Sequence, residues 1–192
     1  MPKFTVGPKD ALVVVDLQVD FCPGGALPVP EGDRVVGPVN RLLGLSGWVK
    51  VATRDWHPPD HASFRGRGGA WPPHCVADTP GARFHPGVDA GKADLIISKA
   101  TRRDAEAYSG FEGTSLAEEL RARGVERIFV CGLATDYCVR ATALDGRRES
   151  LEVVVLEDAI RAVDVQPGDG GRALEEMRRA GCAIARSEDV AP

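Results

Sequence analysis

The sequence has few of the features that mark membrane, secreted or nucleic-acid-binding proteins. It has no apolar run long enough to cross a bilayer, and its N-terminus lacks the apolar core of a signal peptide. Its five cysteines form no CxxC pair and no spacing typical of a disulfide scaffold. No segment concentrates Lys and Arg among aromatics, and the formal net charge is -4. These absences argue against nucleic-acid and membrane partners and predict a cytoplasmic protein.

What is present is the composition of a globular protein with a core of ordinary size. The 192 residues are 43% hydrophobic and 27% charged, which suits one domain spanning residues 1–192. A small neutral or basic molecule fits the charge balance better than a polyanion does. The sequence leaves the oligomeric state open, a homo-oligomer included.

Short apolar runs rich in β-branched residues alternate with helical patterns. The runs are too continuous for strands exposed on one face, so they indicate a parallel sheet buried on both faces. The predicted strands are Ala11–Leu17, Trp48–Thr53, Asp94–Lys99, Arg127–Cys131, Leu151–Leu156 and Cys182–Ala185, and the predicted helices are Arg34–Leu45, Ser115–Arg123, Asp136–Arg148 and Arg172–Arg179. The alternation predicts a doubly wound α/β fold, a mostly parallel six-stranded sheet with helices on both faces. The C-terminal SEDVAP is expected to be a frayed end.

One interval, Arg54 to Ala93, breaks this alternation. It is rich in Pro and Gly and has no helical period, and it holds two tryptophans and every histidine of the chain: His57, His61, His74 and His85. A disordered linker does not have this composition. Long loops in compact domains usually carry function, so we predict an ordered, site-forming loop insertion.

Three polar residues stand where predicted strands end. Asp16 closes VVVD, Lys99 closes LIISK, and Cys138 follows the FVCG run after a short turn. In an open parallel sheet, ligands bind beyond the carboxyl ends of the strands. A nucleophilic thiol, a carboxylate that takes its proton and a neutralising lysine would suit amide hydrolysis. Each residue also has a structural alternative: a turn cap, a solvated lysine and a buried thiol.

Cys138 is placed near the first turn of the next predicted helix. Free N–H groups and the helix dipole at such a turn favour a thiolate, so we expect the pKa of Cys138 to be lowered. The backbone from Ala134 to Cys138 could also hold an oxyanion.

A metal site is indicated by Asp55-Trp-His57, which puts a carboxylate and an imidazole on the same side of an extended segment. His61 and His74 are further nitrogen donors nearby. Asp and His ligands suit one divalent ion, Zn²⁺, Fe²⁺ or Mn²⁺. The alternative is that these histidines only pack and form hydrogen bonds in the loop, which is the interpretation we adopt for His85.

The segments VVVDLQVDFCPGGAL, TRDWHPPDHASF, WPPHCV and GLATDYCVRATALD, with ISK and AYSGFEGT as a further motif, resemble the nicotinamidase/pyrazinamidase branch of the isochorismatase-like cysteine hydrolases. The likeness runs from about Ala11 to Asp158. It implies a catalytic triad of Asp16, Lys99 and Cys138 and a thioacyl-enzyme intermediate. It also implies an oxyanion hole at the backbone of Ala134 and Cys138, beside a non-proline cis peptide bond.

The same resemblance implies a divalent metal on Asp55, His57 and His74, with His61 as a fourth, less expected ligand. Phe21, Trp71 and Tyr108 match positions that line an aromatic substrate pocket. Asp20, four residues after Asp16, is expected either to orient a metal-bound water or histidine or to cap a loop.

The function implied is hydrolysis of nicotinamide, and of pyrazinamide, to the acid and ammonia. The alternatives are another isochorismatase-like amidase acting on a ureido or carbamoyl compound, and a non-catalytic metal-binding or thiol-redox protein. Tyr137 stands where some relatives have histidine, a difference that bears on substrate range.

Overall fold

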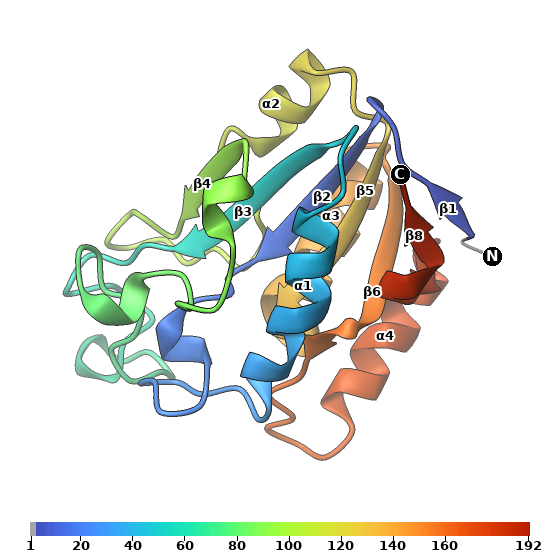
Figure 1. The fold of residues 1–192 in the computed structure, drawn as a ribbon. Helices are drawn as coiled ribbons and strands as arrows, with labels where there is room; N and C mark the ends of the chain where they lie inside the picture. The colour runs from blue at the N-terminus through green and yellow to red at the C-terminus, as the bar shows by residue number, and fades with distance from the viewer. Residues whose placement is uncertain (1–2) are drawn as a thin grey trace.

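A central six-stranded sheet organises the protein, whose computed structural model describes residues 3–192 (Figure 1). The strands, in spatial order, are β4 (Leu95–Lys99), β3 (Val49–Asp55), β2 (Asp10–Val15), β5 (Arg127–Leu133), β6 (Glu152–Arg161) and β7 (Ala183–Ala185). Every neighbouring pair is parallel. The predicted doubly wound α/β fold is therefore confirmed.

Helices cover both faces of this sheet. Helix α1 (Val36–Leu43) lies on one face, while α2 (Leu116–Ala122), α3 (Arg140–Arg148) and α4 (Asp169–Arg179) pack on the other. All six residues of β2 are buried, as expected of a central strand with helices on both sides.

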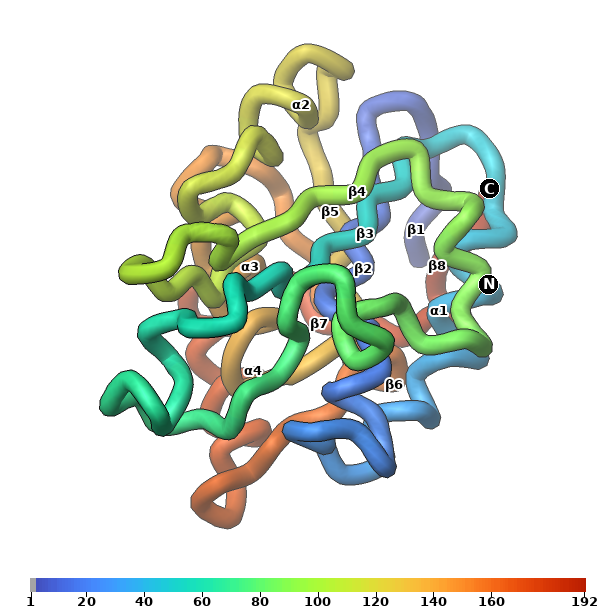
Figure 2. Tube along the Cα trace, turned by 90° about the vertical axis from the view of Figure 1, so that its left-hand side faces the viewer, coloured from blue at the N-terminus to red at the C-terminus, as the bar shows by residue number. Residues whose placement is uncertain are grey.

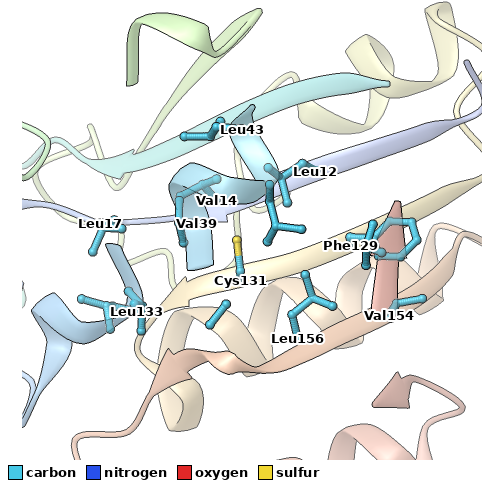
Figure 3. Close-up of a cluster of buried hydrophobic side chains, with 14 of the residues drawn as sticks. Leu12, Val14, Leu17, Val39, Leu43, Phe129, Cys131, Leu133, Val154 and Leu156 are labelled. Atoms are coloured by element: carbon cyan, nitrogen blue, oxygen red, sulfur yellow. The ribbon is translucent and has the colours of Figure 1, made fainter. Parts of the chain in front are cut away.

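Two apolar clusters form the core, one on each face. Figure 3 shows the cluster beneath α1, where Val39 and Leu43 meet side chains of the central strands such as Val14 and Cys131. The opposite cluster joins Leu116 and other helix residues to the second face of the same strands. Because alternate strand residues enter different clusters, the sheet is held from both sides.

The C-terminal segment corrects one expectation. SEDVAP is not frayed: Ser187–Asp189 form a 3₁₀ turn, and β8 (Val190–Ala191) pairs in parallel with β1 (Phe4–Thr5). Arg41 of α1 also donates to the carbonyls of Ser187 and Val190. These tertiary contacts order a segment that has no periodic pattern of its own.

The predicted helix Asp136–Arg148 also differs in detail. Its first part, Thr135–Val139, is a π-helical turn, and regular α3 begins only at Arg140. Single π turns of this kind often occur at functional sites.

The long loop after β3 lies across the carboxyl ends of the strands, as the view onto that side shows (Figure 2). It contains only short 3₁₀ turns. An isolated bridge between Gln18 and Phe84 joins it to the segment after β2, and a bridge between His57 and Val76 connects two parts of the loop itself. The expected ordered insertion is therefore present. Within residues 3–192, no helix has both the length and the apolar character needed to cross a bilayer.

Candidate active site

The site residues lie where the winding of the sheet changes direction. The strand order changes from descending to ascending between β2 and β5, and ligands bind at such a switch point in open α/β sheets. Asp16 follows β2 and Cys138 follows β5, while Asp55 and Lys99 are the last residues of β3 and β4. The topology thus gathers side chains that are far apart in sequence.

A glycine makes the approach of β5 to Asp16 feasible. A Cβ at Gly132 would lie 2.0 Å from the carbonyl oxygen of Val15, and Gly132 has a φ of +107°. No other residue fits this close backbone contact without a shift. The end of β5, and with it the turn that carries Cys138, can therefore lie directly against the end of β2.

Lys99 is the centre of the buried polar cluster. Its Nζ atom lies 2.5 Å from Asp55 Oδ1, 3.0 Å from Asp16 Oδ2 and 3.3 Å from Cys138 Sγ. It also donates to the carbonyl oxygen of Ala107 at 3.1 Å. One ammonium group therefore connects both carboxylates and the thiol.

The charges of this cluster stabilise one another. Burial opposes the charge on Lys99, but Asp16 and Asp55 outweigh it and hold the pKa of the amine well above its ordinary value. Burial likewise opposes ionisation of Asp55, but the charge and hydrogen bond of Lys99, together with His57 and His74, outweigh it, so the pKa of this carboxyl is lowered. For Asp16, burial prevails over Lys99 and its pKa is raised. Of the two carboxylates, Asp16 is therefore the better proton acceptor.

Cys138 corrects the expectation of a lowered pKa. Burial raises the pKa of its thiol well above the ordinary value, against the smaller opposite influence of Lys99. The Cys138 thiol is therefore harder to ionise than an exposed thiol, and its reactivity depends on a nearby base. Such a base is present, because a carboxylate oxygen of Asp16 lies within 4.8 Å of Sγ.

Asp16 leaves one carboxylate oxygen open. Oδ2 is buried and lies 3.0 Å from Lys99 Nζ, but it is not aligned for a hydrogen bond with any group. Lys99 is its ion-pair partner, and no other group within residues 3–192 donates a hydrogen bond to it. This oxygen is therefore suited to receiving a proton at the site.

Asp55, His57 and His74 come together as the sequence predicts, with one potential ligand atom of each within 4.8 Å of the others. His57 Nδ1 lies 2.9 Å from the carbonyl of His74, and His74 Nδ1 lies 2.8 Å from that of Pro72. A carbonyl only accepts, so both Nδ1 atoms carry the proton and both Nε2 atoms offer a lone pair. His57 Nε2 is buried without any hydrogen-bond partner.

His61 is engaged differently. Its Nδ1 lies 2.8 Å from the hydroxyl of Ser63, and its Nε2 lies 3.1 Å from the carbonyl of Ala105. Since Nε2 must donate to that carbonyl and Nδ1 accepts, both nitrogens already have protein partners. Its ring packs against that of His57, with the ring centroids 4.3 Å apart. His61 therefore contacts the ring of a predicted ligand, while its own nitrogens are already hydrogen-bonded.

Asp20 connects two loops. Its carboxylate accepts from the backbone N–H of Cys75 at 2.7 Å and of Ala26 at 3.1 Å. It therefore fixes the turn that follows His74, which agrees with the loop-capping alternative, and within residues 3–192 it makes no hydrogen bond to a histidine ring.

A cavity opens onto this cluster. Phe21, Trp71 and Tyr108 all line it, as predicted, and Trp71 Nε1 donates to the Tyr108 hydroxyl at 3.2 Å. Other lining residues were not predicted, among them Leu27, Val29, Glu106, Tyr137 and Val163. Flat apolar walls with a few convergent polar groups are typical of sites for small aromatic ligands.

Two of these unpredicted residues add an aromatic ring and a carboxylate to the cavity wall. Tyr137 packs edge-on against Trp71 at 5.3 Å and closes the aromatic wall. Glu106 Oε1 lies 4.0 Å from His57 Nε2 and adds a carboxylate beside the histidines. The place of Tyr137 next to Cys138 was a signal in the sequence, whereas the position of Glu106 depends wholly on the course of its loop.

The turn that carries Cys138 has the expected backbone. The peptide bond between Leu133 and Ala134 is cis, and both Ala134 and Cys138 line the cavity. The carbonyl of Ala134 accepts from the N–H groups of Tyr137 and Val139, on either side of Cys138.

Comparison with known proteins agrees with this geometry. Residues 10–189 match the isochorismatase domain family. The chain belongs to this family. Among curated members, it is 38% identical to the nicotinamidase of Escherichia coli K12 over 201 aligned residues, covering 92% of this chain and 94% of that protein.

Solved structures of isochorismatase family members show the same fold. The pyrazinamidase of Pyrococcus horikoshii in complex with zinc is 55% identical, with a TM-score of 0.87 over 93% of this chain and 99% of that one. PnC1 from L. infantum in complex with nicotinate is 37% identical, with a TM-score of 0.93 and 98% coverage of both chains. The resemblance inferred from the motifs is therefore confirmed.

Proposed function

We propose that this protein is a nicotinamidase that hydrolyses nicotinamide, and also pyrazinamide, to the carboxylic acid and ammonia. The observation that carries the proposal is the open, buried oxygen of Asp16 beside the Cys138 thiol, in an aromatic cavity that also holds the cluster of Asp55, His57 and His74. The family and the nicotinamidases among its relatives support the same activity.

In the first half-reaction, Asp16 accepts the thiol proton of Cys138 and Sγ attacks the carboxamide carbon. The oxygen of the amide then becomes negatively charged, and the backbone N–H groups of Ala134 and Cys138 stabilise it. Asp16 passes the proton to the amide nitrogen, the C–N bond breaks and ammonia leaves. The product is a thioester on Cys138.

In the second half-reaction, water replaces ammonia. Asp16 takes a proton from the water as its oxygen attacks the thioester carbon, and the carbon–sulfur bond then breaks. The proton returns to Sγ, so the acid is released and the thiol is restored. The raised pKa of Asp16 suits both directions of proton transfer.

Lys99 remains charged throughout. Its ammonium group contacts Asp16, Asp55 and Cys138. It therefore stabilises negative charge on the Asp16 carboxylate before proton transfer and on the Cys138 sulfur after it. The lysine therefore acts by electrostatics and not as a nucleophile or a base.

The residues present fit a divalent metal. The unpaired, buried Nε2 of His57, the free Nε2 of His74 and the carboxylate of Asp55 form a hard, mixed nitrogen and oxygen donor set suited to Zn²⁺, Fe²⁺ or Mn²⁺. The carbonyl partners at both Nδ1 atoms fix the ring orientations such a site needs. When bound, the metal would position and polarise the pyridine ring of the substrate. The zinc complex of the similar pyrazinamidase supports zinc.

His61 is expected to be dispensable for metal binding. A His57→Gln variant should lose bound zinc, because it removes the unpaired nitrogen, whereas His61→Gln should keep about one equivalent per chain. Elemental analysis of the two purified proteins after dialysis against trace zinc separates them. Equal loss of zinc in both variants would place His61 among the ligands.

The metal-free protein is expected to lose stability as the pH falls from 6.5 to 4. Burial lowers the pKa of His57 to about 4, so the unfolded chain takes up this proton before the folded one does. Above pH 6.5, His57 is neutral in both states and the unfolding free energy is at its full value. Between pH 6.5 and about 4, only the unfolded chain is protonated at His57, so the unfolding free energy falls by about 3 kcal/mol. Urea unfolding with chelator across this range measures it, and His57→Gln should flatten the profile. An equally steep profile in that variant would contradict the assignment.

Ammonia release tests the substrate. The zinc-loaded protein should release ammonia from nicotinamide and pyrazinamide, and a ureido or carbamoyl compound should be a poor substrate. The histidine cluster supports this preference, because a metal that binds a ring nitrogen has no partner in those compounds. Faster release from the carbamoyl compound, unaffected by chelator, would favour the alternative amidase.

The single-domain organisation and the cytoplasmic location remain predictions made from the sequence.

A further inference from the structure

Thr53 is a buried neighbour of Asp16 that the proposed mechanism does not use. It lies on β3, two residues before Asp55, and its side chain is fully buried. Its hydroxyl oxygen lies 2.7 Å from Asp16 Oδ1 and 3.3 Å from the backbone nitrogen of Asp16. One hydroxyl therefore contacts both the backbone and the carboxylate of the proposed base.

The direction of these hydrogen bonds follows from the groups involved. The backbone N–H of Asp16 can only donate, so the Thr53 oxygen accepts from it. The single hydroxyl proton then goes to Asp16 Oδ1. With Oδ1 occupied, the other oxygen, Oδ2, is the one that faces Lys99 and stays open.

Thr53 has little freedom to turn away. A Cβ built at Gly110 would lie 3.1 Å from the Thr53 methyl and 3.6 Å from the methyl of Thr142. The methyl groups of both threonines thus lie close to Gly110, and β-branched side chains have few rotamers. Thr53 is also absent from the cavity lining, so it does not touch a bound substrate.

We propose that Thr53 is a positioning residue whose hydroxyl fixes the rotation of the Asp16 carboxylate, so that Oδ2 faces the Cys138 thiol. The role rests on the proposed function only in that Asp16 is the base. It adds a fourth side chain to the arrangement of Asp16, Lys99 and Cys138, one that contacts Oδ1 of Asp16 while the lysine lies beside Oδ2.

The kinetic test compares three variants on nicotinamide. Thr53→Val keeps the shape but removes the donor, and kcat should fall about 10- to 100-fold with KM within about threefold, since a hydrogen bond to a charged group is lost. Thr53→Ser restores the donor and should recover kcat to within about threefold. Thr142→Val is the matched control: it also removes a buried hydroxyl beside Gly110, and it should leave kcat near the wild-type value.

Crystal structures of the wild type, Thr53→Val and Thr53→Ser form the second arm. The Asp16 carboxylate should rotate in Thr53→Val and keep its orientation in Thr53→Ser. An unmoved carboxylate, an undiminished kcat in Thr53→Val, or an equal loss in Thr142→Val would overturn the inference. If Thr53→Val does not fold, Thr53→Ala carries the same expectations. A wild-type protein that releases no ammonia refutes the proposed function instead, and the crystallographic arm still decides the role of Thr53.

Discussion

Replacement of Cys138 by alanine is expected to lower kcat for nicotinamide at least about a thousandfold. The thioester cannot form without Sγ, and the remaining groups have no second nucleophile to use. Cys138 is the one cysteine among the five that lines the cavity, and all five are free thiols. Its contacts with Lys99 and with Asp16 are the features that the other cysteines lack.

The matched control is Cys182→Ala. Cys182 is also buried and its thiol pKa is raised by burial to about 11, but it lies in the core immediately before β7 and does not line the cavity. Its variant should keep normal turnover. Because Cys138 lines the cavity and has Asp16 beside its thiol as a base, iodoacetamide should label it first in the wild type, and nicotinamide should protect it. Substantial turnover in Cys138→Ala, or earlier labelling of Cys22 or Cys75, would refute the role of this thiol.

Replacement of Lys99 by methionine is expected to have the largest combined effect on stability and activity. It leaves the carboxylates of Asp16 and Asp55 buried and close together without their counter-charge. Breaking a buried pair in this way costs about 3–5 kcal/mol of unfolding free energy. Urea denaturation at pH 7 measures the loss, and ammonia release should fall by orders of magnitude because the charge that stabilises the proton path is gone.

Two further variants test whether the loss of stability comes from the buried carboxylates that lose their counter-charge. In Lys99→Met combined with Asp16→Asn, one unpaired charge is removed, so part of the lost stability should return without any return of activity. Lys9→Met is the surface control: Lys9 pairs with Glu126, but both side chains are about two-thirds exposed, at 68% and 66%, so its loss should cost less than about 1 kcal/mol. Similar costs for Lys9→Met and Lys99→Met would contradict the central place of Lys99.

Much of the fold follows from local sequence because central strands of a parallel sheet are continuous apolar runs. The predicted Ala11–Leu17 and Arg127–Cys131 match the central strands β2 and β5 to within two residues at each end. The gathering of Asp16, Lys99 and Cys138 also follows, because the carboxyl ends of parallel strands share one edge. The short strands β1 and β8 have only two residues each, too few to give a pattern.

The properties that the sequence did not reveal are those that depend on tertiary burial. The helical turn at Cys138 suggested a lowered pKa, but the surrounding protein excludes water so fully that the pKa rises. His61 looks like a metal ligand in a local motif, whereas the carbonyl of Ala105, 44 residues later, occupies its second nitrogen. Thr53 gave no sign of a role because its partner is 37 residues away.

The pairing of β1 with β8 brings Phe4 beside Val190, so the described chain begins and ends on one side of the protein (Figure 1). The cavity lies at the other end of the central strands, beyond their carboxyl ends. A purification tag, a fusion partner or a solid support joined at either end would therefore leave the mouth of the cavity unobstructed. For the same reason, a short linker could join the two ends, and the enzyme could be immobilised as a ring-closed chain that still admits its substrate.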